Sequence, residues 1–208
     1  IGLMPLSLWA QELPFVHYTT ENEVNPLPSA SVREVVQDSQ NYLWFVIFSS
    51  GIIRYDGHRM ELYNSNDGLP GEGVRNAVQD SQGYLWIASD NGVAVSGKSL
   101  EDYEPGERIV FTNRIGETEL LTESVSENTL LADRENGIWF GSQESILRYR
   151  WGENGEIITK SFPARVIMDK DTSTVTSLAV TKGGIAWSGL TDGSIARIVP
   201  GETGLKGW

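Results

Sequence analysis

The sequence predicts an all-β protein, a β-propeller of four-stranded antiparallel blades with about four blades present. Three observations support this prediction. A motif centred on a Trp recurs along the chain, and its copies are spaced by 42 to 53 residues. The 208 residues also include seven Trp, seven Tyr and 22 Gly. Gly makes the tight turns between short strands and aromatic rings fill the space between sheets, as a repetitive β protein requires.

The first two copies of the repeat are closely similar. The segment VREVVQDSQNYLW begins at Val32 and VRNAVQDSQGYLW begins at Val74, which places Trp44 and Trp86 42 residues apart. A period in the forties with strand-like content is typical of propeller blades rather than leucine-rich or helical repeats.

Two weaker copies follow the first pair. They begin at Asn128 and Thr176, and the later Trp spacings are 53 and 48. The four repeats are therefore expected near residues 27–63, 69–112, 125–162 and 173–199.

Each repeat is interpreted as four strands. In the second copy we expect strands over 74–79, 84–89 and 92–96, with an outer strand near 110–112. Turns containing Asp, Asn and Gly separate them, because these residues favour tight turns. The first copy has one more residue between its Trp and the next Gly, which predicts a β-bulge or a longer hairpin loop.

Seven residues that recur at matching positions are assigned structural roles. A Trp on the second strand of a blade is large enough to fill the gap between neighbouring blades, and an Asp accepts hydrogen bonds from the backbone of its own turn. The residues are Trp44, Trp86, Trp139 and Trp187 for packing, and Asp38, Asp80 and Asp133 for the turns.

The first ten residues differ in character from the rest. IGLMPLSLWA resembles the end of a signal-peptide apolar region, with cleavage after Ala10. The alternative is an apolar strand or arm over residues 3–9. Residues 11–208 are assigned to the propeller, and no other segment approaches the roughly 20 apolar residues of a membrane span. We therefore expect a periplasmic or otherwise extracytoplasmic location.

The ring is expected to be incomplete. Residues 15–18 align with an outer strand, but the chain offers no inner strands before it and no further blade after residue 200. We therefore expect part of a larger propeller of about seven blades, completed by missing blades of the same protein or by self-association. A four-bladed ring closed on itself is the alternative.

Composition argues against several classes of function. The formal net charge of −12 disfavours nucleic acids and anionic membranes as partners. There is no Cys, and the two histidines, His17 and His58, form no metal-binding pattern. We find no nucleophile elbow and no P-loop. No catalytic residue, metal site or cofactor is therefore predicted.

Propeller geometry suggests where a ligand would bind. The innermost strands line the central channel, and turns between second and third strands share one of its mouths. The candidates for ligand binding at this mouth are Arg33, Arg75, Asn91, Asn128 and Asp192. Solvated rim residues, or contacts to further blades, are the competing interpretation.

The motifs resemble the two-component regulator propeller repeat. Its pattern is represented by GLPGEGVRNAVQDSQGYLWIASDNG, and GIIRYDG and ILRY fit its third strand. The resemblance covers about residues 15–199 and is strongest in the first two copies. It implies the extracytoplasmic sensor region of a two-component protein, with a histidine kinase, diguanylate cyclase or DNA-binding output elsewhere.

The leading hypothesis is a sensory propeller that recognises a carbohydrate, another small nutrient or a partner protein, without catalysis in this region. Two alternatives remain open: a secreted propeller enzyme, such as a lyase or a glycoside-active protein, and a protein-interaction scaffold. An enzyme requires a positioned acid–base set, whereas the scaffold differs from the sensor only in its context.

Overall fold

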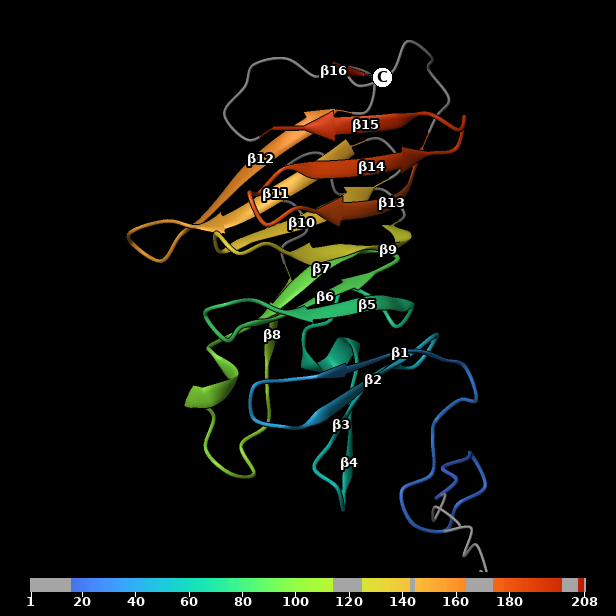
Figure 1. Ribbon diagram of the computed structural model, residues 1–208. Helices are drawn as coiled ribbons and strands as arrows, with labels where there is room; N and C mark the ends of the chain where they lie inside the picture. The colour runs from blue at the N-terminus through green and yellow to red at the C-terminus, as the bar shows by residue number, and fades with distance from the viewer. Residues whose placement is uncertain (1–15, 114–124, 143–144, 164–173, 200–205, 208) are drawn as a thin grey trace, which may run out of the picture.

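The chain forms four separate four-stranded sheets in the computed structural model, which describes residues 16–113, 125–142, 145–163, 174–199 and 206–207. Each sheet is an antiparallel meander of four consecutive strands, so the predicted propeller blades are confirmed. The blades are stacked in chain order, and the first and last lie at opposite ends of the stack (Figure 1). The closed four-bladed ring is therefore not formed.

The strands of blades 1 and 2 are β1 (Val32–Gln37), β2 (Leu43–Ile47), β3 (Gly51–Tyr55), β4 (Met60–Tyr63), β5 (Val74–Gln79), β6 (Leu85–Ser89), β7 (Gly92–Ser96) and β8 (Phe111–Asn113). Those of blades 3 and 4 are β9 (Val125–Ala132), β10 (Gly137–Ser142), β11 (Ser145–Trp151), β12 (Ile157–Pro163), β13 (Val175–Val180), β14 (Ala186–Leu190), β15 (Ile195–Ile198) and β16 (Lys206–Gly207). Two short 3-10 helices, η1 (Ser65–Asp67) and η2 (Leu100–Asp102), lie in connections.

The extra residue of the first repeat forms a longer hairpin loop. Ile47 pairs with Gly51 in blade 1, which leaves three residues in the turn. In blade 2 the matching pair is Ser89 and Gly92, which leaves two. The turn, and not a bulge within the hairpin, accommodates the additional residue.

The strand predicted over residues 15–18 was wrong, and blade 4 extends beyond its expected end at residue 199. Residues 16–18 form no strand, and Phe15 lies outside the described residues. The segment instead lies against blade 1, where the Tyr18 and Tyr55 hydroxyls are 2.6 Å apart. At the other end, the tail does supply an outer strand, because Lys206 of β16 pairs with Arg197 of β15. The proposed leader over residues 1–10 lies outside the described residues.

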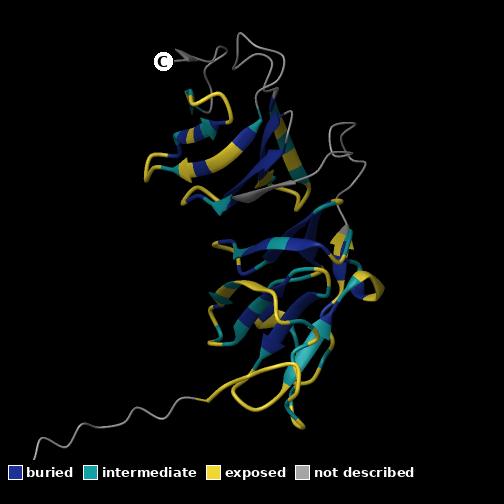
Figure 2. Cartoon of the chain, turned by 90° about the vertical axis from the view of Figure 1, so that its right-hand side faces the viewer, coloured by how far each residue is buried: buried dark blue, intermediate teal, exposed yellow. Residues whose placement is uncertain are grey.

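The hydrophobic core is divided among the three spaces between neighbouring blades. Trp44, Trp86 and Trp139 each project from the second strand of one blade onto the next blade, and each is at most 1% exposed. Buried residues gather in the strands, whereas the turns are exposed (Figure 2). Burial of these large rings stabilises the stack, because the hydrophobic effect scales with the apolar area removed from water.

A hydrogen-bonded turn holds each of these three Trp rings. In blade 1, Asp38 Oδ1 accepts bonds from the backbone N–H groups of Gln40 and Tyr42, at 2.9 and 3.0 Å. Its Oδ2 accepts a bond of 2.8 Å from Trp44 Nε1. Asp80 and Asp133 repeat the arrangement with Trp86 and Trp139, also at 2.8 Å.

Blade 4 departs from this arrangement. Thr181 replaces the Asp, and its Oγ1 accepts a bond of 3.2 Å from the Ile185 N–H. Trp187 is 36% exposed on the face of blade 4 that points away from blade 3. The interblade packing expected for Trp187 is therefore not made within the described residues, because no following blade covers this face.

Candidate functional site

The predicted ligand-binding residues lie where the strands begin or turn on one side of the stack. We call this side the loop face, defined by the β2–β3 turn (48–50), the β6–β7 turn (90–91), the β14–β15 turn (191–194) and the starts of the inner strands β1, β5, β9 and β13. Arg33 and Arg75 occupy the second positions of β1 and β5, and Asn128 lies in β9. Asn91 and Asp192 lie in the turns.

Two of the five residues converge on one aromatic ring. The Arg33 guanidinium carbon lies 4.2 Å from the centroid of Phe48, and that of Arg75 lies 5.9 Å from the same centroid. Phe48 belongs to the three-residue β2–β3 turn, and its N–H donates to the carbonyl of Ser31 at 3.0 Å. We call Arg33, Arg75 and Phe48 the arginine pair site.

The spacing of the two arginines is set by hydrogen bonds between the inner strands. Glu34 Oε2 accepts bonds of 3.0 Å from Asn76 Nδ2 and from the Ala77 N–H. These bonds join β1 of blade 1 to β5 of blade 2, directly beside the arginines in sequence. The site therefore spans a blade boundary, and its geometry depends on how the two blades pack.

The electrostatic character of the arginine pair site is opposite to that of the chain. The chain has a formal net charge of −12, whereas this site brings two guanidinium groups to one ring. Two guanidinium groups beside one aromatic ring give the site a local positive charge. This arrangement suits an anionic or hydroxyl-rich group of a ligand.

The remaining three predicted residues do not join the arginine pair in the described structure. Asp192 Oδ1 accepts bonds from the N–H and hydroxyl of Ser194, at 2.9 and 2.6 Å, which is a turn-forming role. Asn91 is exposed, and its N–H donates to Ser89 Oγ at 3.3 Å. Asn128 is placed on β9, but its side chain lies outside the described residues.

Sequence reasoning missed Phe48 as the centre of this group. The available signal was the extra residue in the first repeat, which lengthens the turn that carries Phe48. That signal was interpreted only as a change in hairpin geometry.

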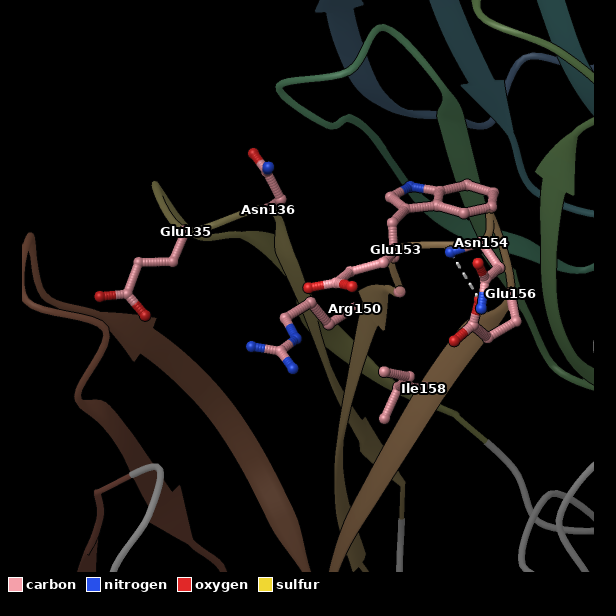
Figure 3. Close-up of a pocket in the computed structure, with 9 residues that line it drawn as sticks. Glu135, Asn136, Arg150, Glu153, Asn154, Glu156 and Ile158 are labelled. Carbon is pink, nitrogen blue, oxygen red and sulfur yellow. Dashed lines mark hydrogen bonds between the residues drawn. The ribbon is translucent and has the colours of Figure 1, made fainter.

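A pocket of about 550 Å³ lies on the opposite side of blade 3, between its β9–β10 and β11–β12 turns (Figure 3). None of the five predicted residues lines it. Its polar lining combines Arg150 with the carboxylates Glu135, Glu153 and Glu156. Glu156 Oε2 accepts a bond of 3.0 Å from the Asn154 N–H, which stabilises the turn.

The aromatic wall of this pocket has a structural role. Trp151 Nε1 donates to Asp80 Oδ2 at 2.9 Å, and the Trp151 ring packs 4.5 Å from the Tyr84 centroid. Trp151 therefore ties blade 3 to blade 2. With three carboxylates and one arginine, the pocket suits neutral or cationic polar groups better than anions.

The described residues offer little for catalysis. His17 and His58 are both exposed. The repeat aspartates already accept bonds from their turns and from Trp rings. No group of three or more His, Cys, Asp or Glu that could hold a metal ion occurs among the described residues.

Comparison with known proteins confirms the resemblance that the motifs carry. The profile of the two-component regulator propeller family matches residues 68–91, within the second repeat. A comparison with curated protein sequences gave no significant match. Within the described residues, no helix has the length and apolar character needed to cross a bilayer.

Several solved structures share the fold. The extracellular domains of two putative hybrid two-component systems from B. thetaiotaomicron have TM-scores of 0.70 and 0.67, at 18% and 16% identity. They cover 93% and 90% of this chain, which spans only 25% and 24% of their length. A catalytically inactive virginiamycin B lyase from Staphylococcus aureus, solved with quinupristin, has a TM-score of 0.61 at 14% identity. That match covers 88% of this chain and 58% of the lyase.

Proposed function

We propose that this chain is part of an extracytoplasmic sensory propeller of a two-component-type signalling protein. The observation that carries this proposal is the two-component regulator propeller match within the second repeat. The structure supports it, since all four repeats fold as blades of the same kind. The sensor would recognise a carbohydrate or another small nutrient and favour one arrangement of the whole protein when bound.

The ligand site that we propose is the arginine pair site on the loop face. It lies at the starts of two inner strands, where a propeller channel opens, and it crosses a blade boundary. A ligand that contacts both Arg33 and Arg75 would therefore be sensitive to the relative position of blades 1 and 2. Such a contact is a physical means of coupling binding to blade arrangement.

The partner that we propose for the ends of the stack is a further blade of the same repeat, from the same protein or a second copy. Blade 4 presents Trp187 and Ile195, which are 36% and 54% exposed, on the face that blades 1–3 bury against a neighbour. Blade 1 presents Val35, 55% exposed, on its other face, which corresponds to the face that blades 2–4 pack against the preceding blade. The two faces are the complementary halves of the interblade contact seen three times in the stack.

The proposed role involves no catalysis by the described residues. The likeness to virginiamycin B lyase concerns the fold, and catalysis needs an acid or base placed beside the reacting bond. The two histidines are exposed, and the repeat aspartates already accept hydrogen bonds from their turns and from Trp rings. Neither group supplies a positioned acid or base among the described residues. Turnover of an oligosaccharide that one carboxylate substitution abolishes would favour an enzyme instead.

The test of the sensory function uses the intact native protein. We expect a neutral or acidic oligosaccharide from a screened panel to raise its melting temperature and to change its signalling output. The double substitution Arg33→Gln and Arg75→Gln should weaken both responses about tenfold or more, because charge-assisted hydrogen bonds are lost. Lys182→Gln is the matched control, because it removes an exposed cation on blade 4, away from the arginine pair site on blades 1 and 2.

Two results would contradict this proposal. A native reading frame without any signalling output module would remove the sensory role. A ligand response that survives the double substitution unchanged would place the ligand elsewhere on the propeller, while leaving the sensory role intact.

A further inference from the structure

Blades 1 and 3 carry an Arg at the same position of the third strand. Arg54 pairs across the hairpin with Trp44, and Arg148 pairs in the same register with Trp139. Both residues are 9% exposed. Because the two positions match, a difference in hydrogen-bond partners between Arg54 and Arg148 must come from the residues around them.

Arg148 is bound by the repeat Asp of its own blade. Its Nε and Nη2 atoms donate to Asp133 Oδ2 at 2.9 and 2.7 Å. Arg148 Nη2 also lies 3.4 Å from Glu135 Oε2. The buried charge in blade 3 is therefore compensated, as buried ion pairs require.

Among the residues that the structure describes, Arg54 makes no such pair. Its guanidinium carbon lies 3.7 Å from the Tyr42 centroid and 5.8 Å from the Trp44 ring. The Nε atom is buried and has no hydrogen-bond partner among the described residues. A buried guanidinium donor without an acceptor is unfavourable and uncommon, so the described residues do not fully compensate the charge of Arg54.

One residue explains the difference between the two blades. The fourth residue after the repeat Asp is Gly137 in blade 3 and Tyr42 in blade 1. A Cβ atom at Gly137 would lie only 2.6 Å from Arg148 Nε and 2.4 Å from Asp133 Oδ2. A side chain at this position would require the Arg–Asp pair of blade 3 to shift. In blade 1 the Arg54 guanidinium lies over the Tyr42 ring instead.

Arg54 lines a pocket on the side of the stack opposite the loop face. The pocket has a volume of about 290 Å³ and lies between the β1–β2 turn and the β7–β8 connection. Tyr42, Tyr103 and Glu104 contribute to its wall, and a cavity of about 110 Å³ that also contacts Arg54 adjoins it. We call these two spaces, which share Tyr42, Arg54 and Gly106 in their walls, the Arg54 pocket.

Two of the three carboxylates that line the Arg54 pocket, Asp56 and Glu61, already have hydrogen-bond or ion-pair partners, and Glu104 is the third. Asp56 Oδ1 accepts bonds of 2.7 Å from the N–H groups of His58 and Arg59, and the first cause of its lowered pKa is the Arg59 backbone bond. Glu61 lies 3.4 Å from the Arg59 guanidinium and accepts a bond of 3.1 Å from the Tyr63 hydroxyl. Two arginines line the pocket, and Arg59 has an ion-pair partner in Glu61. Arg54 has none among the described residues.

We propose that the Arg54 pocket binds the carboxylate of a small molecule whose body is a flat or apolar ring. The guanidinium edge would donate to the carboxylate, which is the acceptor that arginine matches best. Tyr103 and Pro105 contribute the apolar part of a mainly polar lining, and Lys98 Nζ lies 4.5 Å from the Tyr103 ring centroid. The volume suits a molecule of few atoms, below the range of drug-sized ligands. This site is independent of the arginine pair site and of the sensory function.

The first test is calorimetric titration of the intact protein with sodium benzoate, sodium acetate and inorganic phosphate. We expect benzoate to bind more tightly than acetate, and phosphate to bind weakly or not at all. Arg54→Met, which keeps the length of the side chain, should lower benzoate affinity about tenfold or more. Arg150→Met, an exposed arginine in the pocket of blade 3, should leave it unchanged.

A second variant separates ligand binding from simple loss of charge. Tyr42→Gly copies blade 3, and we expect Arg54 to move onto Asp38 and to lose benzoate affinity although the arginine remains. Failure of all three probes to bind, or equal benzoate affinity in the Arg54→Met protein, would overturn the proposal. Tighter binding of phosphate than of benzoate would overturn the assignment to a carboxylate.

Discussion

Blades 2 and 4 carry the same Trp in the same strand position, yet the two rings have different environments. Trp86 is 1% exposed, donates to Asp80 and packs on blade 3. Trp187 is 36% exposed, has Thr181 in place of the Asp, and faces away from blade 3. Its closest cation contact is Arg197, whose guanidinium carbon lies 6.0 Å from the ring centroid.

The difference shows that a repeat motif encodes half of an interface. The Trp and its strand are present in blade 4, but burial needs the next blade, and orientation needs the Asp of the turn. A repeat of this kind stabilises itself through its neighbours, as in other stacked repeat proteins. The comparison leads to four predictions, given from the largest expected effect to the smallest.

The strongest test replaces the buried ring. In the 208-residue chain, Trp86→Ala should lower the free energy of unfolding by about 3–5 kcal/mol, because it opens a cavity between blades 2 and 3. The matched change Trp187→Ala should lower it by about 1 kcal/mol or less, since that ring is partly solvated. Urea unfolding measures both values, and similar losses for the two variants would contradict the comparison.

The next test removes the negative charge of the repeat Asp in blade 3. Asp133→Asn should lower the free energy of unfolding by about 3 kcal/mol, because it leaves Arg148 buried without its ion-pair partner. The Asp133 side chain is 0% exposed and that of Arg148 is 10% exposed. Asp102→Asn, at an exposed position in η2, is the control and should change stability by about 0.5 kcal/mol or less.

The same carboxylate predicts a dependence of stability on pH. Burial raises the pKa of Asp133, but bonds from the Gly137 N–H, Arg148 and Trp139 outweigh it, so the net pKa is lowered. A lowered pKa stabilises the fold above the unfolded-state value of about 3.9, and this stability is lost as pH falls through the folded-state pKa. The stability difference between the parent chain and Asp133→Asn should therefore shrink below about pH 4. A difference that is constant from pH 7 to pH 3 would show that Asp133 is not involved.

The smallest expected effect restores the missing acceptor in blade 4. Thr181→Asp should raise the free energy of unfolding by about 1 kcal/mol, since the new carboxylate can accept bonds from its turn and from Trp187. The isosteric substitution Thr181→Val, which lacks the acceptor, is the control and should be destabilising.

Much of the fold could be predicted from the sequence because the signals are local. Strands β5 and β7 begin and end as expected, since alternating apolar residues and Asp or Gly turns act over a few residues. The turns illustrate this directly: the third residue after the repeat Asp or Thr has a positive φ in all four blades, at Asn41, Gly83, Asn136 and Gly184. Asn and Gly tolerate that conformation better than other residues.

The errors occurred where distant segments decide the outcome. Residues 16–18 lie against blade 1 instead of forming an outer strand, because a strand needs a partner edge. The tail near Lys206 forms β16 because β15 offers such an edge. Phe48 likewise belongs to the site only because Arg33 of blade 1 and Arg75 of blade 2 both lie near its ring.

The sequence by itself determined the blade fold, the four Trp positions and the turns, because short-range periodicity and turn chemistry specify them. The tertiary structure alone decided which Trp rings are buried and which arginines are compensated. Arg54 and Arg148 occupy matching places in the repeat, but Arg148 pairs with Asp133 beside Gly137, whereas Arg54 lies over the Tyr42 ring. Packing between side chains from separate strands and turns controls that choice, and a linear motif does not record it.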